Sequence, residues 1–277
     1  MHFAFYPLQF RFLAKQHVRF PAGLAANTLR GAFGCTFRRL ASAQDYARIF
    51  EPRAHNGEGP SGLADWPRPF VFRAAALDGR VVSPGEEFHF GLNVFDVRNP
   101  ALHLYVETFR EMALEGIGIG RGRAELLDAA GRSPTFLSLL PPLESVASIR
   151  VQFVTPTELK SGDGLVESPE FAALFARARD RVSTLGALYG EGPLPVDFAE
   201  LGRLATHVRM THCEIHAVNA TRRSTRTGQV HSLSGFVGEA AYEGELAPFV
   251  PYLRAAAITG VGRQTTWGKG EIAVYSV

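Results

Sequence analysis

The C-terminal segment GVGRQTTWGKG (260–270) combines bare backbone with positive charge. Its glycines can leave backbone N–H groups free to form a concave site for phosphate oxygens. Arg263 and Lys269 add charge, and Trp267 offers a ring on which a base can stack. The alternative is an ordinary turn between a helix and a strand, with Trp267 in the core. The residues that we expect to contact a phosphate chain here are Gly260, Gly262, Arg263, Trp267, Gly268, Lys269 and Gly270.

Two familiar phosphate motifs do not fit this segment. A P-loop has four residues between its glycines and Ser or Thr after the lysine. Here five residues separate Gly262 from Gly268, and a glycine follows Lys269. A dinucleotide fingerprint follows a strand and opens a helix, whereas EIAVYSV (271–277) is typical of a closing strand.

Two further groups of basic residues could bind a polyanion. The segment RRSTRTG (222–228) places three arginines in an expected hairpin loop, where their guanidinium groups repel one another unless anions or carboxylates lie among them. A helix expected over 23–40 has a polar face with further basic side chains. A solvated turn and a solvated helix face are the alternatives. The residues of these two groups are Arg222, Arg223, Arg226, Asn27, Arg30, Arg38 and Arg39.

The segment THCEIHA (211–217) could hold a metal ion. His212, Glu214 and His216 alternate along an expected strand, which puts all three side chains on one face. Two imidazoles and a carboxylate are a ligand set for zinc. Because no further ligand can be identified from the sequence, we favour a polar sheet face and predict no metal and no cofactor. A metal-dependent hydrolase stays the weakest alternative.

The composition favours a globular protein of two domains. The chain has 277 residues, of which 46% are hydrophobic. No apolar run approaches the roughly 18 residues that span a bilayer, and the N-terminus lacks a signal-peptide pattern. Cys35 and Cys213 are too few for a disulfide framework. We therefore expect a cytoplasmic protein that does not bind membranes.

The charge is unevenly distributed along the chain. The formal net charge is +2, but residues 1–53 contain eight Lys or Arg and only two acidic residues. A basic first quarter on a nearly neutral protein indicates a local footprint for a polyanion.

The two halves of the chain repeat one order of elements. Hydrophobic periodicity predicts strand, helix, strand, strand, helix and strand in each half. In the first half the ranges are 3–15, 23–40, 68–77, 86–96 and 99–114, with Asn99 as the N-cap of the second helix, and the last strand follows the glycines of GIGIGRGRAELL (116–127). In the second half they are 148–160, 168–189, 208–218, 233–243, 248–258 and 271–277.

Each half also has a glycine-rich turn between its second helix and its last strand, at 116–122 and at 260–270. The repeat predicts an α+β protein of two tandem ferredoxin-like (βαββαβ, RRM-like) domains with a C-terminal glycine-rich loop. The expected domains are residues 1–140 and 148–277.

This arrangement resembles the RAMP superfamily of CRISPR-associated proteins, and within it the repeat-specific endoribonucleases that process precursor CRISPR RNA. The first half contributes TLRGAFG (28–34), DYARIFEP (45–52) and WPRPFVF (66–72). The second half contributes FVTPTELK (153–160), RRSTR (222–226), LSGFVGEAAYEGEL (233–246) and GVGRQTTWGKGEI (260–272). The last three motifs, in this order, are the most specific.

The resemblance implies an RNase that uses no metal ion and holds RNA in the cleft between two domains. A side-chain base helps the ribose 2′-OH to attack the adjacent phosphate, which leaves a 2′,3′-cyclic phosphate and a 5′-OH end, while positive charge stabilises the phosphate. DNA lacks this nucleophile. The glycine-rich loop and the polar face of the first helix would then approach the RNA.

The sequence departs from the family's pattern at the catalytic residue. Members commonly carry a histidine on or just after the first helix, and residues 23–40 contain none. The nearest are His17 and His55, with Tyr46 and Lys15 as candidate partners. An exposed loop residue is the alternative for each histidine. Of the cysteines that relatives have near DYARIFEP only Cys35 is present, so a metal clip is not expected there.

The expected partner is CRISPR repeat RNA or the mature CRISPR RNA. Other CRISPR effector subunits and a homodimer are left open by the sequence. The main alternative to an enzyme is a catalytically silent RAMP subunit that holds guide RNA inside a larger effector complex.

Overall fold

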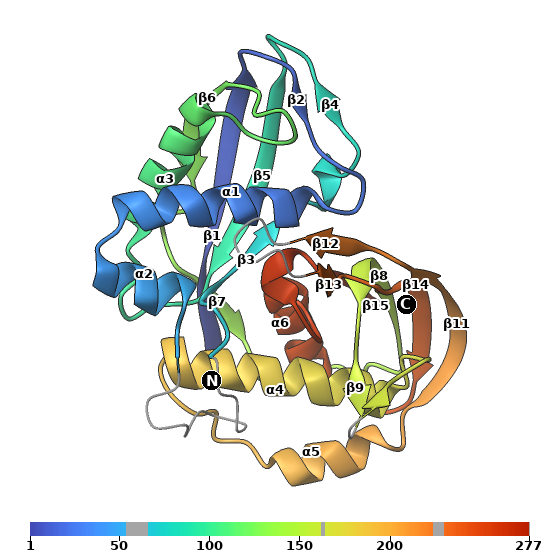
Figure 1. Ribbon diagram of the computed structural model, residues 1–277. Coiled ribbons are helices and arrows are strands. Elements are labelled where there is room, and N and C mark those ends of the chain that lie inside the picture. The colour runs from blue at the N-terminus through green and yellow to red at the C-terminus, as the bar shows by residue number, and fades with distance from the viewer. Residues whose placement is uncertain (54–65, 162–163, 224–229, 277) are drawn as a thin grey trace.

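The first of two antiparallel sheets lies in the N-terminal half of the chain. The structure is a computed structural model that describes residues 1–53, 66–161, 164–223 and 230–276 (Figure 1). The helices α1 (Ala25–Leu40) and α3 (Leu102–Glu115) cover one face of this sheet. Its strands are, in spatial order, β3 (Phe70–Arg73), β5 (Glu87–Val94), β1 (His2–Ala14) and β6 (Ala124–Ala130), with β7 (Thr135–Ser138) paired to the start of β1.

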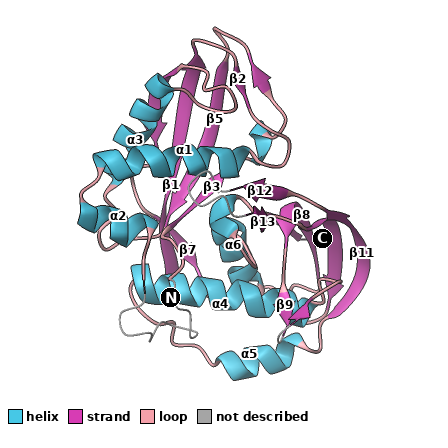
Figure 2. Ribbon diagram, in the orientation of Figure 1, coloured by secondary structure: helices cyan, strands magenta, loops and turns pink. Residues whose placement is uncertain are grey.

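The second sheet repeats this pattern in the C-terminal half. The helices α4 (Phe171–Tyr189) and α6 (Val250–Thr259) pack against it. Its strands are, in spatial order, β11 (Arg209–Val218), β14 (Gly235–Glu243), β8 (Ser148–Thr157) and β15 (Ile272–Ser276). In both sheets the first strand of the half lies between the third and the fourth, and the second strand is at an edge. The predicted α+β fold of two ferredoxin-like units is confirmed (Figure 2).

Several shorter elements were not predicted. The helices α2 (Ala43–Phe50) and α5 (Phe198–Ala205) each begin after a capping side chain: Ser42 accepts a hydrogen bond from Asp45 N, and Asp197 accepts one from Glu200 N. No helix in the described ranges is both long and apolar enough to cross a membrane. The remaining short elements are β2 (Val18–Arg19), η3 (Ala75–Leu77), β4 (Val81–Val82), β9 (Lys160–Ser161), β10 (Gly164–Leu165), β12 (Thr221–Arg223), β13 (Val230–Ser232) and η4 (Thr265–Trp267).

The predicted start of α3 is wrong by a few residues. Ala101, with a φ of 46°, is the residue before the first helical position, and its side chain provides no cap. The backbone N–H of Asn99 instead donates to Asp96 Oδ1 at 2.9 Å. Asn99 therefore belongs to a turn before the helix, because an aspartate side chain stabilises that turn locally.

The first domain has an aromatic core that fixes α1 on its sheet. Phe33 of α1 stacks on Tyr105 of α3 at 5.8 Å between ring centroids and lies 6.0 Å from Phe72 of β3. Leu29 and Phe37 lie on the same side of α1 and are fully buried. This apolar stripe, which follows the helical period, orients the opposite side of α1 toward solvent.

The two domains meet at a buried joint around the end of α6. Arg73 Nη2 on β3 donates to the carbonyl oxygens of Ala257 and Ile258 at 2.9 and 2.8 Å. Asn93 Nδ2 on β5 also donates to Ile258 O, at 2.9 Å, and Arg181 Nε on α4 donates to Thr259 O at 2.8 Å. The last carbonyl groups of a helix lack partners within the helix. We call these three side chains and the end of α6 the domain joint.

The packing of β3 shows how the domains are stacked. Phe70 and Phe72 lie in the core of the first domain, whereas Val71, on the opposite face of β3, lies in the core of the second. Arg73 shares this second face, where Glu271 Oε2 lies 3.7 Å from its guanidinium group. Burial lowers the pKa of Arg73 and raises the pKa of Glu271. The helix-free side of the first sheet is thus covered in part by the second domain.

Candidate nucleic-acid interface

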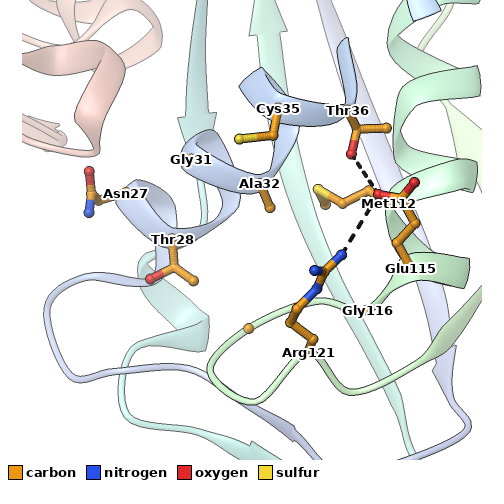
Figure 3. Close-up of a pocket in the computed structure, with 11 residues that line it drawn as sticks. Asn27, Thr28, Gly31, Ala32, Cys35, Thr36, Met112, Glu115, Gly116 and Arg121 are labelled. Atoms are coloured by element: carbon orange, nitrogen blue, oxygen red, sulfur yellow. Dashed lines mark hydrogen bonds and ion pairs between the residues drawn. The ribbon is translucent and has the colours of Figure 1, made fainter. Parts of the chain in front are cut away.

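A pocket of about 370 Å³ lies between α1 and the loop that follows α3 (Figure 3). Residues at positions 27, 31 and 35, and at 28, 32 and 36, line it from α1, because a spacing of four keeps them on one side of the helix. None of these side chains is large, so the solvent side of α1 is left open. Met112 and Glu115 of α3 and Arg121 of the loop form the opposite wall.

A carboxylate organises the polar groups at one end of this pocket. Thr36 Oγ1 donates to Glu115 Oε2 at 3.2 Å, and Arg121 Nη2 lies 4.0 Å from the same oxygen (Figure 3). The guanidinium group of Arg39 donates to Glu115 Oε1. Two guanidinium groups thus share one carboxylate. An RNA phosphate could take the place of that carboxylate, because both anions accept the same charge-assisted hydrogen bonds.

The loop that carries Arg121 depends on glycines that allow close backbone approach. Gly116 has a φ of 112°, and a β-carbon there would lie 2.1 Å from Arg121 O. A β-carbon on Gly118 would lie 2.4 Å from Arg19 O of β2. No L side chain fits at either position without moving the backbone. These contacts hold Arg121 between β2 on one side and the pocket on the other.

The glycines of the C-terminal loop also allow other parts of the chain to approach the backbone closely. A β-carbon on Gly262 would lie 2.3 Å from Glu158 O, and one on Gly268 would lie 2.4 Å from Ala26 Cβ of α1. The N–H groups of Gly260, Gly268 and Gly270 donate to protein carbonyl groups. They are therefore not free to form the predicted phosphate site. The prediction of a concave phosphate site is corrected at these three residues, because their N–H groups already donate to carbonyl groups of the protein.

Replacing Gly270 by alanine is expected to destabilise this loop strongly. Gly270 has a φ of 71°, and the new β-carbon would lie 1.9 Å from Val261 O. We expect the free energy of unfolding to fall by about 2–4 kcal/mol, from left-handed backbone strain and overpacking together. Urea unfolding of Gly270→Ala measures this. Gly120→Ala is the control, because Gly120 has a φ of 84° but open space around it. An equal loss of free energy of unfolding in both variants would show that the close contact with Val261 O does not contribute to the destabilisation.

The two basic residues of the C-terminal loop are held by one carboxylate. Lys269 Nζ donates to Glu158 Oε2 at 3.0 Å and to Ser234 O at 2.6 Å, and only 2% of Lys269 is exposed. Arg263 Nη1 donates to Glu158 Oε1 at 2.5 Å. Burial alone would raise the pKa of Glu158, but its contacts with Lys269 and Arg263 outweigh burial and lower it. Lys269 is therefore a structural residue, while half of the Arg263 side chain is exposed.

Trp267 and Arg30 connect α1 to the C-terminal loop. The guanidinium carbon of Arg30 lies 4.9 Å from the ring centroid of Phe50 and 5.5 Å from that of Trp267. Arg30 is only 8% exposed. A buried guanidinium group between two rings stabilises their packing through cation–π interactions. Arg30 thus has a structural position, and its predicted contact with RNA does not fit its burial.

The structure does not bring Tyr46 together with Lys15 and His17, the other described candidate catalytic residues. Lys15 and His17 are exposed in the turn before β2, where Lys15 Nζ pairs with Glu125 at 2.6 Å. Tyr46, on α2, packs on Phe37 and Phe50, and α2 lies far from β2 within the first domain (Figure 1). Tyr46 is thereby corrected as a partner of these two residues. His55 lies outside the described residues.

The other predicted basic residues are spread over several places. Asn27 lines the pocket, Arg39 contacts Glu115, and Arg38 is exposed with its guanidinium group 5.8 Å from the ring of Tyr46. The backbone of Arg222 and Arg223 belongs to β12, which pairs with β13 as a hairpin. The side chains of these two arginines, and all of Arg226, lie outside the described part of the structure.

The three residues of the metal alternative lie on the helix-free side of the second sheet. His212, Glu214 and His216 are exposed, and His212 Nε2 is 3.9 Å from Glu214 Oε2. Within the described ranges, no three His, Cys, Asp or Glu side chains are grouped so as to hold a metal ion.

Thr36, Glu115 and Arg121 are not among the residues predicted from the sequence. The available signal was the glycine-rich turn of the first half, GIGIGRG, which parallels the C-terminal one and includes Arg121. We used that turn to predict the fold and assigned it no contact. Glu115 gave no signal of its own, because its contact with Arg39 depends on how α1 and α3 pack.

Comparisons with known proteins agree with this fold. Residues 3–137 match a family model described as an N-terminal domain, and residues 151–272 match the model of the CRISPR-associated endoribonuclease Cas6 family. Over residues 151–272 the chain is therefore similar to the Cas6 family. No protein with a curated description matches it by sequence.

Solved Cas6 structures share the fold of this chain over nearly its full length. The product complex of Thermus thermophilus Cas6 (TTHB231) has a TM-score of 0.61 at 16% identity and covers 98% of this chain and 99% of its own. The Cas6 (TTHA0078) product complex has a TM-score of 0.56 at 18% identity, with 99% of this chain and 100% of that chain covered.

A Cas6 domain in a larger assembly is also similar. The partial Cas6-RT-Cas1–Cas2 complex has a TM-score of 0.58 at 11% identity, with 99% of this chain and 46% of that chain covered. At these identities the likeness establishes the fold alone.

Proposed function

We propose that this protein is an RNA-cleaving enzyme that matures precursor CRISPR RNA by cutting within the repeat. The observation that carries the proposal is the match of residues 151–272 to the endoribonuclease Cas6 family. The pocket beside α1 supports it, because Arg39 and Arg121 share a single carboxylate there. The matched Cas6-RT-Cas1–Cas2 complex extends the proposal to other CRISPR proteins as partners.

The proposed reaction uses the RNA's own 2′-OH as the nucleophile and needs no metal ion. Attack on the adjacent phosphate gives a 2′,3′-cyclic phosphate and a 5′-OH end. Arg39 and Arg121 would stabilise the charge that develops on the phosphate, which is commonly the largest contribution to such catalysis. Thr28, Thr36 and Asn27 offer hydrogen bonds that could orient the sugar and the phosphate.

The proposal also requires a proton acceptor. Among the described residues, no histidine lines the pocket. Among the described histidines, His17 is the one whose segment packs on the loop that carries Arg121, since a β-carbon on Gly122 would lie 2.1 Å from His17 O. We therefore propose His17 as the acceptor, and Lys15, which is paired with Glu125, as a secondary candidate.

Incubating the protein with its repeat RNA, with and without EDTA, tests this function. We expect cleavage that EDTA does not affect, with cyclic phosphate at one new end and a 5′-OH at the other. The double variant Arg39→Gln/Arg121→Gln should lose about 10²–10³-fold in the cleavage rate at saturating RNA. Arg110→Gln is the control, because Arg110 is exposed on α3 and pairs with Glu107 outside the pocket.

A catalytically silent RNA-binding subunit is the second candidate function. It is favoured by one observation, the absence of histidine from α1 and from the lining of the pocket. Tight binding of repeat RNA without any cut would support it. Cleavage that EDTA abolishes would contradict both candidates.

A further inference from the structure

Three segments far apart in the sequence meet at the end of the first domain that is remote from the second domain. Ile119 N donates to Arg19 O at 2.8 Å, Phe20 N donates to Arg80 O at 2.9 Å, and Lys15 N donates to Arg123 O at 2.9 Å. The strands β2 and β4 lie in this region (Figure 1). We call residues 15–20, 80–82 and 116–123 the basic tip.

The basic tip carries positive charge without acidic residues. Its three segments contain one lysine, four arginines and no Asp or Glu. The acidic residues that flank it in sequence are already engaged: Glu125 with Lys15, Glu86 with the backbone of Ser83, and Glu115 with α1 and Arg121. Glu125 and Glu115 thus offset the charges of Lys15 and Arg121 within the tip and leave the charges of the other three arginines.

Three of the tip's arginines have no ion-pair partner in the part of the chain that the structure describes. Arg19, Arg80 and Arg123 are exposed, and no described carboxylate lies within 4.0 Å of their guanidinium groups. Most other described arginines contact a carboxylate or a carbonyl group, as Arg11 and Arg48 do. Guanidinium groups gathered without counter-charges repel one another, and a polyanion removes that repulsion.

The surface between these arginines suits a nucleic-acid strand. Val81 and Ile119 are 57% and 56% exposed. Exposed apolar side chains on the same segments as these arginines can contact the apolar parts of sugars and bases. The tip is also continuous with the pocket, because Arg121 lines the pocket and its loop is bonded to β2 through Ile119.

We propose that the basic tip is a second RNA-binding surface, which holds the phosphate backbone of the strand that leaves the pocket. This inference rests on the proposed function and extends it. Contacts to phosphate carry no sequence information and add affinity that falls with salt. The tip should therefore strengthen the binding of any RNA strand long enough to reach it, whatever its sequence.

Binding measurements on Arg19→Gln/Arg80→Gln/Arg123→Gln test the inference. At about 0.15 M salt we expect Kd for the repeat RNA to rise about 10- to 100-fold, and the slope of log K against log salt to become shallower by about 2. An unrelated single-stranded RNA of equal length should lose affinity by the same factor. Thermal unfolding should be unchanged, because all three side chains are exposed.

The control variant removes the same net charge elsewhere. Arg110, Arg132 and Arg254 are also exposed, and none of them belongs to the tip or the pocket. Replacing these three by glutamine should leave the salt slope within about 1 of the wild-type value. The variant Arg19→Lys/Arg80→Lys/Arg123→Lys should keep most of the affinity, because lysine also binds phosphate as a point charge.

The outcomes separate the two proposals. If the wild-type protein binds no RNA, the proposed function fails. If the wild type binds and cuts RNA while the tip variant and the charge-matched control have equal Kd and equal slopes, the function stands and the tip inference is overturned.

Discussion

A single deoxyribose at the nucleotide just 5′ of the cut is expected to abolish cleavage of the repeat RNA. The proposed nucleophile is the 2′-OH of that nucleotide, so its removal leaves nothing to attack the phosphate. Phosphate contacts, including those proposed for Arg39 and Arg121, do not involve this hydroxyl. Binding should therefore be retained within a small factor. The measurement compares Kd and the single-turnover cleavage rate for the two RNAs.

The matched RNA control carries the deoxyribose one nucleotide further from the cut, where cleavage should continue. Cleavage of the first RNA at the same phosphate would contradict the mechanism. A protein variant tests the proton acceptor. His17→Ala should lower the cleavage rate about 10²–10⁴-fold if His17 accepts the proton. Cleavage at the wild-type rate in that variant would remove His17 from the mechanism without affecting the role of the 2′-OH.

Replacing Arg73 by methionine is expected to destabilise the protein more than any exposed substitution. The guanidinium group of Arg73 donates to Ala257 O and Ile258 O and lies near Glu271. Methionine fills similar space but leaves a helix-end carbonyl and a buried carboxylate without their partner. Breaking such a buried pair typically costs about 3–5 kcal/mol. The loss of free energy of unfolding is measured by urea titration.

Arg11→Met provides the comparison for this prediction. Arg11 is on the same sheet and pairs with Glu87 at 3.1 Å, but about half of each side chain is exposed. Such surface pairs contribute about 0–1 kcal/mol. Equal losses in the two variants would show that the domain joint does not depend on Arg73. A selective loss for Arg73→Met would show that charge buried between the domains holds them together.

Much of the fold could be predicted because its signals are local. The stripe of Leu29, Phe33 and Phe37 requires only the helical period, and these three side chains are buried in the structure. The order of elements, repeated in both halves, predicted the ferredoxin-like fold that the two sheets show. Local signals were also missed: Ser42 and Asp197 cap α2 and α5.

The candidate site could be predicted only in part, because the role of a charged residue depends on its partners. The sequence presents Lys269 and Arg121 alike, as basic residues among glycines. In the structure Lys269 is buried against Glu158, whereas Arg121 is exposed at the pocket. Nothing within either glycine-rich segment distinguishes them, since Glu158 is more than a hundred residues away from Lys269.

The sequence by itself determined the repeated βαββαβ order, the two glycine-rich turns and the basic character of the first quarter of the chain. Only the tertiary structure decided which charges are buried in the domain joint, which are paired in the C-terminal loop and which gather unpaired at the basic tip. Secondary structure follows from periodicity and capping within a few residues of the chain. Burial and ion pairing follow from contacts between distant segments, and those contacts decide which arginines are free to bind RNA.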